Sequence, residues 1–126
     1  MGHVVALNHE EGVRLDAARL VALVTELGDS AAESVVARAM EEMAVRLAEM
    51  EEHYREGDTR VICRSARTLA RLAAEVGMTT LARVAADVNT CAGRGDMVAF
   101  AATWARLLRI ADRSLTAIWE LHGTTG

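Results

Sequence analysis

Four arginines recur at helical spacing near the middle of the sequence. We call them the arginine stripe: Arg60, Arg64, Arg67 and Arg71. On an α-helix their spacings of four, three and four place them within about 30° of one direction, opposite the apolar face. Small residues lie between and beside them: Cys63, Ala70 and Ala74. Because like charges one turn apart mildly destabilise a helix, helix stability does not explain the pattern. These seven residues predict a docking surface for a partner; the alternative is a solvated face in an arginine-rich protein.

His53 is the one histidine with carboxylates at helical spacing. Glu49, His53 and Glu56 are four and three residues apart, so their side chains could converge on one cation. Two carboxylates and one imidazole from a single helix leave a divalent ion underligated. The pattern therefore favours a half-exposed histidine on a solvated helix edge over a metal site.

Patterns typical of other chemistry are missing from the sequence. It contains no glycine-rich phosphate loop, no H-E-x-x-H pair, no duplicated Glu-x-x-His and no Ser/His/Asp grouping. Cys63 and Cys91 have no C-x-x-C spacing, which is typical of free thiols in a reducing cytoplasm. We expect a cytoplasmic protein without cofactor, bound metal or catalytic residue.

The elements that position these residues follow from the composition. The 126 residues suit one domain with a proper core, and proline is absent while aromatic residues make up 3%. With hydrophobic residues at 52% and alanine at nearly a fifth, the chain is expected to be all-α. No apolar run reaches ~18 residues and no signal-peptide layout is present, so no membrane association is expected. The net charge of −4 argues against nucleic-acid binding.

Glycine–aspartate dipeptides divide the chain at Gly28-Asp29, Gly57-Asp58 and Gly95-Asp96. Glycine ends a helix in the left-handed conformation, and aspartate caps the free N–H groups of the next helix. A fourth break is predicted at Gly77, with Thr79 as the cap. Residues 1–14 lack sustained periodicity and predict a flexible tail, followed by one helical domain over residues 15–123.

Apolar periodicity predicts five helices, at about Asp16 to Leu27, Ser30 to Glu56, Asp58 to Val76, Thr79 to Ala92 and Asp96 to Leu121. Ser30 and Glu33 predict a capping box. The buried face of the first helix is expected to contain Leu20, Leu23, Val24 and Leu27. The buried face of the second helix is expected to contain Val36, Met40, Met43, Leu47, Met50 and Tyr54. The buried face of the third is expected to contain Ile62, Ala66, Leu69, Ala73 and Val76. Because short connections make sequential helices antiparallel, the expected fold is an up-and-down four-helix bundle with an additional short N-terminal helix.

The segment ARTLARLAAEVG and its surroundings resemble the histidine-containing phosphotransfer (Hpt) family of two-component phosphorelays, a family of signal-transduction proteins. The family signature on this helix is close to A-H-x-L-K-G-S-A-x-x-L-G. Ala66, Leu69, Ala73 and Gly77 agree with it, and Val76 replaces the leucine conservatively. LARVAADVN and GRGDMVAFAATWARLL resemble the closing hairpin of the family, so the resemblance covers roughly residues 15–121.

The sequence departs from the family at the residues that carry the chemistry. Arg67 stands where the family has its phosphoacceptor histidine, and Ala70, Arg71 and Leu72 replace its lysine, glycine and serine. A guanidinium is always protonated and has no free lone pair, so Arg67 cannot accept a phosphoryl group. The resemblance implies a non-catalytic Hpt-like protein, a pseudo-phosphotransferase, that binds the receiver domain of a response regulator or a histidine kinase as an adaptor or inhibitor. It is expected to be a monomer or weak dimer.

Two alternatives stay open at this point. One is an active phosphotransfer protein that uses a cryptic acceptor such as His53. The other is a structural or oligomerisation bundle, in which the arginine stripe pairs with the acidic second helix of another subunit.

Overall fold

The computed structural model describes residues 13–125, with side-chain surroundings described as far as Ile118. Within these residues the chain forms five α-helices and no strand, which confirms the all-helical prediction. The helices are α1 (Ala17–Leu27), α2 (Asp29–Glu56), α3 (Thr59–Glu75), α4 (Thr79–Arg94) and α5 (Met97–Thr125). None of these helices is both long enough and apolar enough to cross a membrane.

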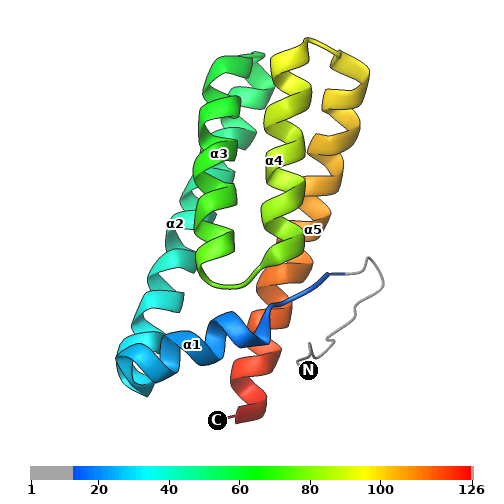
Figure 1. The fold of residues 1–126 in the computed structure, drawn as a ribbon. Helices are drawn as coiled ribbons and strands as arrows, with labels where there is room; N and C mark the ends of the chain where they lie inside the picture. Colours follow the sequence, from blue (N-terminus) through cyan, green and yellow to red (C-terminus); the bar gives the residue numbers. More distant parts are fainter. Residues whose placement is uncertain (1–12, 126) are drawn as a thin grey trace.

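Helices α2 to α5 lie alongside one another, and α1 crosses beneath the turn between α3 and α4 (Figure 1). Consecutive helices pack together, with the closest association between α3 and α4. Helices α2 and α5 have 28 and 29 residues, whereas α3 and α4 have 17 and 16. The longer pair therefore extends past the α3–α4 turn, and α1 lies in the space next to these extensions (Figure 1).

The core contains the apolar faces that the periodicity predicted for α2 and α3, together with residues of α4 and α5. Every predicted core position on α3 is fully buried: Ile62, Ala66, Leu69, Ala73 and Val76. On α2, Met43 and Met50 are fully buried and the remaining predicted positions are partly buried against the core. Tyr54 stacks on Trp104 of α5, with ring centroids 4.8 Å apart, and this contact joins the first and last of the long helices. Burial of each large aliphatic side chain stabilises the fold by roughly 1.5–3 kcal/mol.

The helices are interrupted at all four predicted glycines, and the predicted caps form at two of them. Gly57 and Gly95 adopt the left-handed conformation, and the side chains of Asp58 and Asp96 accept N–H groups of the following helices. At Gly28 the predicted break is correct, since α1 ends at Leu27, but the predicted cap is wrong, because Asp29 already lies inside α2 and no described side chain caps this helix. Gly28, with φ 86° and ψ 164°, adopts a positive-φ conformation that favours glycine and is itself the cap residue of α2, so the Ser30–Glu33 capping box does not form.

The prediction for Thr79 is also wrong, since Met78 occupies the cap position of α4. The hydroxyl of Thr79 instead donates to the carbonyl of Arg14, and the N–H of Arg14 donates to Thr80 Oγ1 at 2.8 Å. Val13 is fully buried. The packed chain thus begins by Val13, earlier than the predicted tail boundary, and the rest of that predicted tail, residues 1–12, lies outside the described residues.

Helix α1 does not bury the face predicted for it. Leu23 is buried and Leu20 partly so, but Val24 and Leu27 are 42% and 46% exposed. Val21, on the same helix, is 62% exposed. Because α1 lies across the end of the other helices rather than along them, only part of its apolar surface meets a neighbour.

Candidate partner-binding face of α3

Helix α3 presents the arginine stripe on the side opposite its buried residues. The side chain of Asp58 caps its first turn by accepting the N–H of Val61 at 3.3 Å. All four arginines of the stripe are exposed. The sequence therefore placed these side chains on the correct face, and the structure arranges them as one cationic row along the outside of the molecule.

The guanidinium groups are engaged unequally. Arg71 pairs with Glu75 one turn along α3 at 3.3 Å, and both side chains are at least half exposed. Such exposed pairs contribute ~0–1 kcal/mol, so this one gives way readily to a competing anion. Arg60, Arg64 and Arg67 have no acidic partner among the residues that the structure describes.

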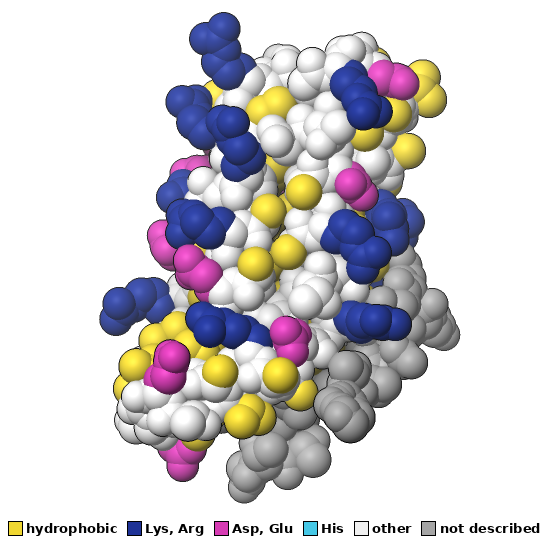
Figure 2. Space-filling view, viewed as in Figure 1, with side chains coloured by type: hydrophobic (Ala, Val, Ile, Leu, Met, Phe, Trp, Pro, Cys, Tyr) yellow, Lys and Arg dark blue, Asp and Glu magenta, His cyan; other side chains and the backbone are white. Residues whose placement is uncertain are grey.

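Small residues occupy the surface between the stripe and α4. Cys63 is partly buried, and its Sγ lies 3.6 Å from the carbonyl oxygen of Asn89 on α4. Ala70 packs partly against the core, and Ala74 is exposed. Figure 2 shows small side chains between the two helices and basic side chains along the outer edge of α3. A partner can therefore approach the backbone of α3 closely while meeting guanidinium groups at its border.

Charge is divided unevenly between neighbouring helices. Residues 59–94, which contain α3 and α4, carry six arginines and two carboxylates. Helix α2 carries eight carboxylates and three arginines. The basic character of the α3 face is thus local, and it exists on a chain whose net charge is −4.

The Glu49, His53 and Glu56 arrangement does not assemble into a cation site. Glu49 turns to Arg46 at 3.2 Å, whereas His53 Nδ1 lies 3.5 Å from Glu56 Oε1 and 3.9 Å from Asp58 Oδ2. Among the described residues, no group of three His, Cys, Asp or Glu side chains is placed to hold a metal ion. The side chain of His53 is 30% exposed, which agrees with the predicted half-exposed histidine flanked by carboxylates.

Neither does His53 lie on the α3 face. His53 is in the last turn of α2, next to the α2–α3 turn. Arg67 lies nine residues after Asp58, the cap residue of α3, so it is roughly 13 Å along the α3 axis from that turn. The carboxylates of Glu56 and Asp58 beside the Nδ1 of His53 would repel a phosphoryl group on that nitrogen.

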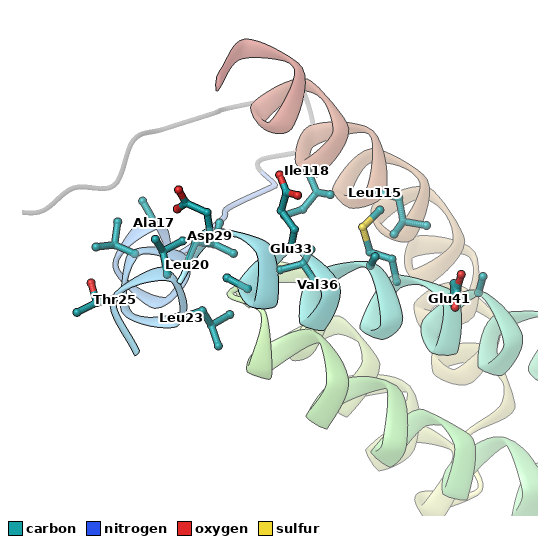
Figure 3. Close-up of a pocket in the computed structure, with 16 residues that line it drawn as sticks. Ala17, Leu20, Leu23, Thr25, Asp29, Glu33, Val36, Glu41, Leu115 and Ile118 are labelled. Atoms are coloured by element: carbon teal, nitrogen blue, oxygen red, sulfur yellow. The ribbon is translucent and has the colours of Figure 1, made fainter. Parts of the chain in front are cut away.

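Sequence reasoning missed a second surface, an apolar groove between α1, α2 and α5 (Figure 3). The only signal for it was the surplus of large aliphatic residues on α1. Periodicity indicated that this face should be covered, but it did not indicate by what.

Comparison of the chain with models of known protein families, with curated proteins and with solved structures finds no match.

Proposed function

We propose that this chain is an Hpt-like protein of a two-component phosphorelay that acts by binding, with the α3 face docked on a receiver domain or histidine kinase. The single observation that carries the proposal is the exposed cationic row centred on Arg67, at the position where the Hpt signature has histidine. In this proposal α2 to α5 form an up-and-down four-helix bundle, and α1 is the additional short helix. The consecutive packing of these helices supports that arrangement.

The chemistry of Arg67 supports binding rather than transfer. A guanidinium has five N–H donors and no acceptor, so it can hold a carboxylate or phosphate but cannot attack a phosphorus atom. As the Hpt resemblance implies, receiver domains present acidic residues and a divalent metal where phosphohistidine docks. Arg67 would enter that acidic site in place of the imidazole.

The surroundings of Arg67 favour a close complex. Cys63, Ala70 and Ala74 leave no bulky side chain between the stripe and α4. Each guanidinium–carboxylate contact in a desolvated interface contributes ~1.5–3 kcal/mol, so two or three such contacts anchor a modest complex. Occupation of the receiver or kinase in this way would block or bias the flow of phosphate.

The test is a double charge reversal, Arg67→Glu with Arg71→Glu, titrated against purified receiver domains and histidine kinases of the source cell. We expect affinity to fall about 100-fold or more, because two contacts are replaced by repulsion. The matched control is Arg38→Glu with Arg55→Glu, which makes the same change at two exposed positions of α2 and should leave affinity nearly unchanged. Equal affinity of the first variant and the unaltered chain for a partner would contradict the proposal.

Phosphate labelling addresses the transfer alternative directly. After exposure to a phosphorylated receiver or an autophosphorylated kinase, we expect no acid-labile label on this chain. Label that disappears in His53→Ala would instead identify an active phosphotransfer protein.

A further inference from the structure

The groove next to α1 has a volume of about 1150 Å³. Its floor consists of side chains that pack partly against the core: Leu20, Val36, Met40 and Leu115. One wall is α1, where Val21 and Val24 are more than two-fifths exposed. Figure 3 shows Leu20 on α1, Val36 on α2 and Ile118 on α5 around the groove.

Among the described residues that line the groove, every charged one is acidic: Asp29, Glu33 and Glu41, all on α2. Thr25 is the only other polar residue in the described part of the lining. Asp29 and Glu41 are twelve residues apart on one helix, so they span roughly 18 Å along its axis. The groove is thus a largely apolar surface with carboxylates spaced along its α2 wall.

These dimensions suit a helix better than a compact ligand. Pockets for small molecules have volumes of roughly 300–1000 Å³ and enclose most of the ligand, whereas a helix of about twelve residues is ~18 Å long. In helix-in-groove recognition, an amphipathic helix lays its apolar face into a hydrophobic groove. The carboxylates of the groove then favour a helix with basic residues beside its apolar face, because acidic residues there would be repelled.

We propose that this groove binds an amphipathic helix of another protein whose apolar face is bordered by lysine or arginine. The aliphatic floor would receive apolar side chains spaced three and four residues apart, and Asp29 and Glu41 would meet the basic residues beside them. The proposal rests on the groove alone and is independent of the α3 face.

The probe is a labelled synthetic peptide of about 15 residues, a length at which a peptide helix begins to be stable. It has leucines at spacings of three and four, flanked by arginines; a matched peptide has glutamate in place of every arginine. By fluorescence anisotropy with the full chain, we expect the arginine peptide to bind at least about tenfold more tightly, which corresponds to ~1.4 kcal/mol.

Two substitutions at exposed lining positions test the location. Val21→Asp and Glu41→Arg should each weaken binding of the arginine peptide about tenfold. Their matched controls are Val45→Asp, at a valine that is 54% exposed outside the groove, and Glu42→Arg, at the exposed neighbour of Glu41 that does not line it. Both controls should bind like the unaltered chain. Circular dichroism checks that each variant is folded, and Glu41→Arg carries the test alone if Val21→Asp is not.

Three results would overturn the proposal. The first is equal affinity for the two peptides, or no binding of either. The second is an equal loss of binding in the lining and control variants. The third is a dimer of the full chain in sedimentation that Val21→Asp dissociates, because the occupant would then be a second copy.

Discussion

At the scale of single residues, Arg67 and His53 differ in both position and chemistry. Arg67 is exposed on the middle of α3 and offers donors without a lone pair, so its own chemistry favours holding an anion. His53 has an imidazole, whose unprotonated nitrogen carries a lone pair, but it lies at the end of another helix with two carboxylates beside its Nδ1. If the proposed Hpt-like role holds, the residue at the phosphoacceptor position and the residue with an imidazole are therefore different residues.

Ser114 supplies a stability prediction at this scale. It is fully buried in α5, and its Oγ has no hydrogen-bond partner among the described residues. Ser114→Ala removes an unsatisfied hydroxyl and introduces a better helix former, so the free energy of unfolding should rise by about 1 kcal/mol. Urea denaturation measures the change as a higher midpoint at constant slope.

Thr103 is the control for that substitution. Its hydroxyl donates to the carbonyls of Ala99 and Phe100, both at 3.0 Å. Thr103→Val removes a satisfied hydroxyl from the same helix and should bring no gain. If Ser114→Ala lowers stability, the hydroxyl has a partner and this interpretation of Ser114 is wrong.

At the scale of elements, the least predictable feature is how α1 is attached. The N–H of Asp16 donates to the carbonyl of Gly77 at 2.6 Å, and Arg19 Nε donates to the carbonyl of Glu75 at 2.8 Å. These contacts hold the start of α1 against the α3–α4 turn. They join residues about sixty positions apart, which is why local periodicity could not anticipate the crossing of α1.

Gly77 tests this attachment. Its φ is +82°, and a Cβ there would lie 2.8 Å from the carbonyl oxygen of Asp16. Gly57 has nearly the same φ, +78°, but open space around it. Gly57→Ala should therefore cost only the backbone strain, about 1 kcal/mol, and Gly77→Ala about 2–3 kcal/mol, because the segment at Asp16 must also shift. Urea denaturation of both variants measures the difference, and an equal loss would show that the contact with Asp16 contributes nothing.

At the scale of the whole molecule, charge is separated between an acidic α2 and a basic α3–α4 pair. Two copies could bring these surfaces together, as the oligomerisation alternative requires. Exposed ion pairs contribute ~0–1 kcal/mol each, however, while association costs at least ~4 kcal/mol in lost freedom.

We therefore expect sedimentation equilibrium to give the monomer mass of 13.6 kDa at both low and high salt. Salt screens surface pairs, so an assembly built on them would be larger at low salt. A mass that rises as salt is removed would favour the oligomerisation bundle over the proposed adaptor.

Much of the fold and part of the candidate site could be predicted from the sequence. The buried faces of α2 and α3, the capping by Asp58 and Asp96, and the outward direction of the arginine stripe were correct. The cap at Thr79 was wrong because its hydroxyl donates to the carbonyl of Arg14, a partner that only the folded chain brings near. The capping box at Ser30 was wrong because α2 already begins at Asp29, with Gly28 as its cap residue. The role of the stripe stays a prediction.

The amino-acid order by itself determined where each helix lies and which face is apolar, because those properties depend on neighbours within one or two turns. Only the tertiary structure decided that α1 crosses the ends of longer helices and leaves Val21 and Val24 exposed beside a groove. That outcome depends on the unequal lengths of α2, α3, α4 and α5 and on hydrogen bonds to the distant α3–α4 turn. The physical reason is that a local pattern indicates that a surface is apolar, whereas what covers it is settled by contacts between residues far apart in the chain.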